Sequence, residues 1–240
     1  MRFIKSGLFY LSTLLLLLTA NCSAPNSNAE VILIQDSTLK SARISKTTGF
    51  KAEALHIELV GLSISADSYG NLVLKSGGKS VRKAIDLGKG FYTHAIHYYD
   101  NAESVALFFE TMDSQGSYNK VYCLNKETGQ TEWQTTLGNF SLSVGQAEND
   151  ILYLGSSENV YALNLKTGKL LWQTEGLYHL YGFNYYDSIA VTPSRIKLIG
   201  QTQASSFSRD RENKTVSINK QNGKIQAVKL ADGPESPDRY

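Results

Sequence analysis

Short apolar runs, interrupted by polar residues and separated by turn-forming residues, make up much of the chain. Clear runs are residues 95–99, 105–109, 140–144, 151–154 and 182–186. The turns predicted beside them are residues 100–101, 148–150 and 187–188, which are rich in Asp and Asn. A period of two is typical of β-strands with one buried face, and no helical periodicity of useful length occurs. The pattern therefore predicts an all-β fold.

A segment that ends in Trp occurs twice, at residues 121–133 and 160–172, with Val, Tyr, Leu, Asn, Thr, Gly and Trp at the same spacing. A third copy, residues 218–223, keeps the Asn and the Gly, but Ala227 stands where the Trp would be. A fourth copy, residues 74–78, is one residue shorter and has no Trp. The structural positions of this repeat are Leu74, Leu124, Gly129, Trp133, Leu163, Gly168, Trp172, Ile218 and Gly223.

Each copy has the features of a β-hairpin. In the two clearest copies the Val-Tyr-x-Leu stretch alternates as a strand does. The Thr-Gly or Asn-Gly pair of the three longer copies supplies the positive φ of a tight turn. Trp133 and Trp172 fall on the returning strand, and each needs a neighbouring repeat because one hairpin cannot bury an indole. Two more strand-like runs precede each hairpin. Four strands in a unit of roughly 40 to 55 residues are typical of propeller blades.

The pattern thus predicts a β-propeller-like array of four-stranded blades over residues 31–230. About four blades are recognisable, and residues 31–34 are interpreted as the remnant of a fifth copy in an N-terminal half-blade. Residues 231–240, with two Pro and a Gly, are predicted to be a disordered tail.

The N-terminus has the pattern of a secretory signal peptide. Arg2 and Lys5 precede an apolar run at residues 7–20, which is too short to span a bilayer of roughly 30 Å. We interpret residues 1–21 as the signal peptide and expect the protein to be exported.

The residues that follow resemble the lipobox of bacterial lipoproteins, in which a Cys becomes the lipidated first residue. Cys22 would be that residue, and residues 22–30, small and polar, would be a flexible tether. Leu18 stands four residues before the Cys instead of three, and Asn21 replaces the adjacent small residue. The alternative is a soluble exported protein cleaved after Ala20.

Charge and cysteine content narrow the function. The 24 basic residues balance 22 acids, and Arg2 and Lys5 belong to the signal, so the exported part is formally neutral. This argues against nucleic-acid binding, which requires concentrated positive charge. Cys22 and Cys123 are too few for a disulfide framework or a cysteine-based zinc site. Cys123 lies in an apolar run and is predicted to be an inert core residue.

The string Val-Tyr-Ala-Leu-Asn-x-x-Thr-Gly-Lys-x-x-Trp at residues 160–172 resembles the repeat of pyrroloquinoline-quinone-type propellers. That superfamily includes quinoprotein alcohol dehydrogenases and a cofactor-free propeller lipoprotein of the outer-membrane β-barrel assembly machinery. The chain is closest in character to the lipoprotein. Family members usually close a ring of seven or eight blades, whereas this chain would form either a small ring or an arc with open edges. Open edges favour pairing with another chain.

No catalytic or cofactor-binding constellation is evident in the sequence. There is no adjacent cysteine pair and no acidic cluster with calcium-ligand spacing. His94 and His97 are three apart in a strand-like run, which places them on opposite faces and disfavours metal chelation. We therefore expect no catalytic residue, no metal site and no cofactor.

Two other features have a structural and a functional interpretation. Residues 98–100 recur as residues 185–187, both Tyr-Tyr-Asp; the recurrence favours core residues at one blade position over a recognition surface. The charged stretch around residue 210 is either a solvated hairpin tip or a contact loop for a partner. The residues of this candidate partner loop are Arg209, Asp210, Arg211 and Glu212.

These observations favour a noncatalytic exported propeller that acts as a protein-binding module or scaffold in the bacterial cell envelope. We expect it in the periplasm, anchored to the outer membrane by the lipid on Cys22, with an envelope protein as partner and no nucleic acid. Two alternatives stay open. One is a small periplasmic enzyme, quinoprotein-like or hydrolytic, on a degenerate propeller, and the other is a periplasmic immunity protein.

Overall fold

The computed structural model describes residues 40–43, 55–67, 69–88, 92–113, 116–138, 142–156, 158–203 and 211–230. All of them belong to one unit of the chain, Ile32–Tyr240. The predicted signal peptide, Cys22, the tether, residues 31–34 and the C-terminal tail lie outside the described residues.

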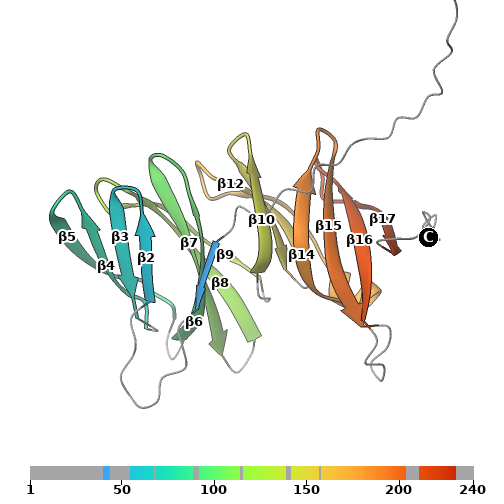
Figure 1. Ribbon diagram of the computed structural model, residues 1–240, viewed down its shortest axis with the longest axis horizontal. Helices are drawn as coiled ribbons and strands as arrows, with labels where there is room; N and C mark the ends of the chain where they lie inside the picture. Colours follow the sequence, from blue (N-terminus) through green and yellow to red (C-terminus); the bar gives the residue numbers. More distant parts are fainter. Residues whose placement is uncertain are drawn as a thin grey trace, which may run out of the picture. The chain divides into compact units, whose positions relative to one another are not determined.

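The described residues form four sheets, which we call blades 1 to 4 in chain order, and consecutive strands of each blade pair antiparallel (Figure 1). Blade 1 contains β2 (Leu55–Leu59), β3 (Leu62–Ala66), β4 (Asn71–Ser76) and β5 (Lys79–Ala84). Blade 2 contains β6 (Tyr92–Asp100), β7 (Ser104–Asp113), β8 (Gly116–Asn125) and β9 (Thr131–Leu137). Blade 3 contains β10 (Leu142–Glu148), β11 (Ile151–Ser156), β12 (Val160–Asn164) and β13 (Leu170–Thr174). Blade 4 contains β14 (Phe183–Val191), β15 (Arg195–Gln203), β16 (Arg211–Asn219) and β17 (Ile225–Leu230). The predicted all-β, propeller-like fold is confirmed.

One additional strand joins blade 2. β1 (Lys40–Arg43) pairs antiparallel with β6, with Lys40 opposite Tyr98 and Arg43 opposite Ala95. Blade 2 is therefore a five-stranded sheet in the order β1-β6-β7-β8-β9. A segment that precedes blade 1 in the chain thus extends blade 2. It covers the edge of β6 that would otherwise offer its backbone groups for pairing.

The core consists of apolar clusters, each of which contains residues of two consecutive blades. In β7, Leu107 and Phe109 pack with blade 1, while Ala106 and Phe108 pack with blade 3. Both Phe side chains are completely buried. Because successive residues of a strand point to opposite faces, a sheet covered on both faces needs an unbroken apolar run. This explains the sequence Val-Ala-Leu-Phe-Phe. A third cluster joins blades 3 and 4.

The repeated Asn is the residue that shapes the turn between the third and fourth strand. Asn125 Oδ1 accepts hydrogen bonds from the backbone N–H of Glu127 at 3.1 Å and of Thr128 at 2.9 Å. Asn164 makes the same pair of contacts in blade 3, at 3.0 and 2.9 Å. The Gly that follows has φ near +70°, which only glycine adopts readily. The Asn-x-x-Thr-Gly motif therefore encodes this turn locally.

Blade 4 departs from the predictions in two places. Asp187 and Ser188 form no turn, because β14 continues to Val191 through a register shift between Tyr186 and Ser188. The turn comes at residues 192–194, where the N–H of Thr192 bonds to the carbonyl of Arg195 at 2.8 Å. A short helix that the sequence pattern did not predict, α1 (Leu177–Tyr181), precedes β14. Among the described residues, no helix is long and apolar enough to cross a membrane.

The two Tyr-Tyr-Asp stretches are consequently not equivalent. Tyr99 is one residue from the end of β6 and is half-buried, whereas Tyr186 lies mid-strand in β14 and is 2% exposed. The recurrence in sequence does not correspond to one blade position, because β14 is prolonged beyond its Asp.

Candidate functional site

Two tryptophans connect successive blades through one recurring contact, which we call the indole dock. Trp133 on β9 donates its indole N–H to the backbone carbonyl of Leu165 in blade 3, at 2.7 Å. Its ring lies so close to Gly168 that a Cβ there would be 2.3 Å from Trp133 Cε3. The dock thus consists of a turn glycine under the ring and a carbonyl that accepts the N–H.

The same dock joins blades 3 and 4. Trp172 on β13 donates to the carbonyl of Lys220 at 3.0 Å, and a Cβ at Gly223 would lie 2.6 Å from Trp172 Cε3. The ring centroid of Tyr153 is 6.1 Å from that of Trp172, so the indole also has an aromatic neighbour.

The junction of blades 1 and 2 lacks an indole. There the turn glycine of blade 2, Gly129, faces Leu74 and Val81: a Cβ on Gly129 would lie 3.0 Å from Leu74 Cδ1 and 3.7 Å from Val81 Cβ. Leu74 and Val81 are opposite each other in the β4–β5 pairing. They occupy the place that the Cys123–Trp133 pair occupies at the next junction.

Leu74 differs from Leu124 and Leu163, the equivalent residues of the repeat, because its side chain lies on the other face of its sheet. Leu124 packs with blade 1 and Leu163 with blade 2, so each contacts the preceding blade. Leu74 instead packs with the following blade. The reason is the shorter turn: Gly77 and Gly78 connect β4 and β5 in register without a bulge, whereas the longer turn of blade 2 is followed by a register shift between Cys123 and Leu124. A one-residue difference in register moves a strand residue to the other face. Ile218, in the third strand of blade 4, contacts the preceding blade as Leu124 and Leu163 do.

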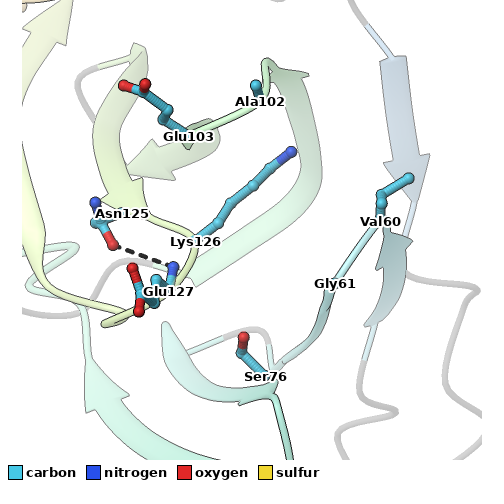
Figure 2. Close-up of a pocket in the computed structure, with 8 residues that line it drawn as sticks. All are labelled: Val60, Gly61, Ser76, Ala102, Glu103, Asn125, Lys126 and Glu127. Carbon is cyan, nitrogen blue, oxygen red and sulfur yellow. Dashed lines mark hydrogen bonds between the residues drawn. The ribbon is translucent and has the colours of Figure 1, made fainter.

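Two adjoining hollows lie at this junction. The first, which we call the junction groove, has a volume of about 470 Å³ (Figure 2). Its lining residues are Val60, Gly61, Ser76, Ala102, Glu103, Asn125, Lys126 and Glu127. The second, which we call the dock slot, has a volume of about 260 Å³. Its lining residues are Leu62, Leu74, Ser76, Lys79, Val81, Lys126, Glu127, Thr128 and Gly129. The two hollows share Ser76, Lys126 and Glu127.

The groove is built by four hairpin turns that meet where blades 1 and 2 adjoin. In Figure 2 the turn with Val60 and Gly61 lies across from the turn with Asn125, Lys126 and Glu127. These turns lie at one end of their blades, because the first and third turns of an antiparallel meander share an end. In blade 2 they are linked by the N–H of Lys126, which donates to the carbonyl of Glu103 at 2.9 Å.

The charged side chains of the groove differ in whether they are already engaged within the chain. Lys126 is held within blade 2, because its ammonium lies 3.4 Å from an Asp100 carboxylate oxygen and donates to the carbonyl of Asn101. Glu103 and Glu127 are exposed. Val60 is 92% exposed, an apolar side chain at the tip of a tight turn. The groove therefore offers an apolar contact and two exposed carboxylates to a bound molecule.

Among the described side chains, the thiol and the histidines lie outside the residues that line the groove. Burial raises the pKa of the Cys123 thiol to about 12, so it stays protonated and unreactive at neutral pH. His97 Nε2 lies 3.6 Å from Glu110 Oε2, and both side chains are buried within blade 2. His56 contacts Ser65 Oγ in blade 1, and His179 contacts Glu158. No group of three His, Cys, Asp or Glu side chains in the described part of the chain could hold a metal ion.

The candidate partner loop is described only at its end. Arg209 and Asp210 lie outside the described residues, and Arg211 begins β16. Glu212 follows within β16, with a carboxylate oxygen 3.5 Å from the Lys214 ammonium. The groove residues were not predicted. The sequence feature that could have located them is the missing Trp of the copy at residues 74–78.

A family model described as outer membrane protein assembly factor BamB matches residues 107–236. The chain belongs to this family. The BamB match begins within β7 and includes both indole docks, which agrees with the pyrroloquinoline-quinone-like propeller repeat identified at residues 160–172. No curated protein matches the chain.

Several solved structures are similar at low identity. The computationally designed Ika4 protein is 12% identical with a TM-score of 0.41, covering 78% of this chain and 96% of that one. BamB from Moraxella catarrhalis is 14% identical with a TM-score of 0.40, covering 83% and 73%. Quinohemoprotein alcohol dehydrogenase from Comamonas testosteroni is 13% identical with a TM-score of 0.44, and the match covers 73% of this chain but only 35% of the dehydrogenase.

Proposed function

We propose that this chain is an exported, lipid-anchored, noncatalytic propeller protein that binds another protein of the bacterial cell envelope. The observation that carries the proposal is membership of the BamB family, whose description names outer-membrane protein assembly. Assembly factors act through contacts with other proteins, so the relevant property of the chain is the surface that it presents.

The end of the blades that carries the first and third turns supports a binding role because hydrogen bonds hold its backbone rigidly. In three blades the turn between the third and fourth strand bonds to the turn between the first and second. These hydrogen bonds join Lys126 N to Glu103 O at 2.9 Å, Leu165 N to Asp150 O at 2.8 Å and Lys220 N to Ser194 O at 3.1 Å. A rigid surface loses little conformational entropy when a partner binds, which favours affinity. The junction groove lies at this end.

The noncatalytic part of the proposal rests on the chemistry of the groove. Its lining contains two exposed carboxylates, a lysine already engaged by Asp100, and no cysteine or histidine. The one described thiol, Cys123, is buried and has a raised pKa. Activity profiling with and without pyrroloquinoline quinone and calcium is the check, and turnover that depends on the quinone would contradict this part.

The anchoring part of the proposal rests on the sequence around Cys22, which resembles a lipobox. More than one acyl chain on the mature N-terminus would hold the protein at a membrane, whereas a single chain gives only marginal binding. We propose that this membrane is the outer membrane, which the family description names, and that the protein lies on its periplasmic side.

Photo-crosslinking in intact cells tests partner binding. A photoreactive amino acid is introduced separately at Val60 and Glu127, which line the groove, and at Tyr69, a 67% exposed residue of the turn between β3 and β4, which serves as the control because that turn lies at the other end of blade 1. We expect a discrete adduct with one envelope protein from the groove positions and not from position 69. Absence of any discrete adduct from both groove positions would reject the proposed function.

A further inference from the structure

We propose that the dock slot between blades 1 and 2 receives a tryptophan side chain from the partner protein, in the position that the chain's own tryptophans occupy at the two later junctions. This inference rests on the proposed function and specifies the chemistry that the partner must present. The occupant is inferred from the chain itself, since the structure contains two filled examples of the same site.

The backbone of the slot matches the backbone of the filled docks. Gly129 has φ +69°, against +68° for Gly168 and +73° for Gly223. In all three turns the glycine N–H donates to the carbonyl of the repeated Asn at 2.9 Å. Blade 2 therefore presents blade 1 with the same turn that blades 3 and 4 present to an indole.

The hydrogen-bond acceptor is also in place. The carbonyls that accept the indole N–H belong to Leu165 and Lys220, each two residues after the aliphatic anchor of its repeat. Lys126 holds this position in blade 2 and lines the slot. Its own N–H bonds to the preceding turn, as the N–H of Leu165 and of Lys220 do. The same backbone frame thus surrounds the Lys126 carbonyl.

The side chains that face this turn are too small to fill the site. Leu74, which is 2% exposed, covers part of the Gly129 face, so the space lies beside it and over Val81, which is 40% exposed. Trp133, in the place equivalent to Val81, is 8% exposed. The space left has a volume of about 260 Å³. A cavity of about 150 Å³ suffices for benzene, so the slot accommodates the two fused rings of an indole.

The adjoining groove gives the partner segment a path into the slot. The two hollows share Ser76, Lys126 and Glu127, so a polypeptide lying in the groove can place a side chain in the slot. Lys79 lines the slot, whereas Glu103 and Glu127 are exposed along the groove, so the groove side favours basic residues next to the tryptophan. The partner motif is therefore a tryptophan flanked by lysine or arginine.

The test uses the full chain and the peptide acetyl-Lys-Trp-Lys-amide carrying 5-fluorotryptophan, followed by ¹⁹F NMR so that Trp133 and Trp172 give no signal. Control peptides replace the tryptophan by alanine or by 1-methyltryptophan. We expect saturable binding of the first peptide. The alanine peptide carries no fluorine, so it is added as a competitor and should not displace the first peptide. The methylated indole, also fluorinated at position 5, should bind about two- to tenfold more weakly, the range expected for one lost hydrogen bond.

Val81→Trp is the decisive variant, because it supplies the chain's own indole to the slot. We expect this substitution to weaken peptide binding at least tenfold. Arg82→Trp adds the same side chain at the next position of β5, which points to the opposite face, and should change binding less than twofold. Equal binding by both variants would overturn the proposal.

A second measurement needs no variant. With ¹³C-labelled methyl groups, titration of the unmodified chain should shift the signals of Leu74 and Val81, which line the slot, and leave that of Leu171, exposed on β13, unchanged. Saturation without a shift at Leu74 and Val81 would reject the slot, whatever the folding of Val81→Trp.

The experiments distinguish a failure of the indole slot from a failure of the proposed function. Envelope crosslinks from Glu127 that survive Val81→Trp unchanged would leave the binding function standing and reject the indole slot. Peptide binding that Val81→Trp abolishes, together with no envelope crosslink from the parent chain, would keep the slot and reject the function.

Discussion

Replacing Trp133 by Ala removes the side chain that joins blade 2 to blade 3. Only 8% of Trp133 is exposed, its N–H bonds to the Leu165 carbonyl at 2.7 Å, and its ring covers Gly168. Deleting a buried indole lowers the free energy of unfolding by about 3–5 kcal/mol. Trp133→Phe keeps part of the ring packing but removes the donor from the part-buried Leu165 carbonyl, and should lower the free energy of unfolding by about 1–3 kcal/mol.

The loss should be visible as a lower melting temperature and as reduced cooperativity. For a chain of this size about 1 kcal/mol corresponds to about 2–4 °C, so Trp133→Ala should melt about 6–20 °C below the parent. In a repeat protein the stability is approximately a sum over units and neighbouring interfaces. The substitution weakens one interface, so blades 3 and 4 should remain folded after the junction of blades 2 and 3 has opened.

Urea unfolding followed by two signals tests this reasoning. Far-UV circular dichroism reports on all blades, whereas in Trp133→Ala the fluorescence comes from Trp172 and reports on the junction of blades 3 and 4. We expect the dichroism midpoint to fall further than the fluorescence midpoint. Leu171→Ala, at a 43% exposed position of β13, is the control and should change stability by less than about 0.5 kcal/mol. If Trp133→Ala melts within one degree of the parent, the indole dock does not join the blades.

Further predictions concern the turn glycines and the two cysteines. Gly168→Ala should destabilise the fold most, Gly223→Ala less and Gly129→Ala least. The added Cβ would lie 2.3 Å from a Trp133 ring atom, 2.6 Å from a Trp172 ring atom and 3.0 Å from the flexible end of Leu74, respectively. Equal melting temperatures for the three variants would contradict the dock geometry. Burial raises the pKa of Cys123 to about 12 in the folded chain, against about 8.5 in an unfolded chain. The thiol therefore loses its proton first in the unfolded state, so the free energy of unfolding should fall as the pH rises from about 8.5 towards 12. Urea midpoints at pH 8 and pH 10.5 should differ less in Cys123→Ala, and an unchanged difference would show that the thiol is not buried. Cys22→Ala should release the protein from membranes that retain the parent through a high-salt wash, and a parent that is already soluble with no added mass would remove the lipid anchor from the proposal.

Much of the fold was predictable because its determinants are local. The turn of the Asn-x-x-Thr-Gly motif is formed by the Asn side chain bonding two residues ahead, so its position follows from the motif alone. The run through Phe108 and Phe109 identifies a strand, since a buried sheet needs apolar residues on both faces. Asp187 and Ser188 misled the prediction because a bulge in a paired strand tolerates turn-forming residues.

The candidate site was less predictable because it depends on contacts between blades. The sequence shows that the copy at residues 74–78 lacks a Trp, but the volume left beside Gly129 depends on where Leu74 and Val81 lie. The exposure of Val60 likewise depends on the packing of the neighbouring turns. Nothing in the spacing of these residues along the chain brings them together.

The amino-acid sequence by itself determined most of the strands, the turns of the Asn-x-x-Thr-Gly motif and the repeat, since these depend on side-chain alternation and on hydrogen bonds a few residues apart. Only the tertiary structure decided that β1 extends blade 2 and that Leu74 faces the following blade. It also decided that each indole rests on the next blade's glycine. The physical reason is strand register: a change of one residue in a turn moves a side chain to the opposite face of its sheet, and the residues that it then contacts belong to a different blade.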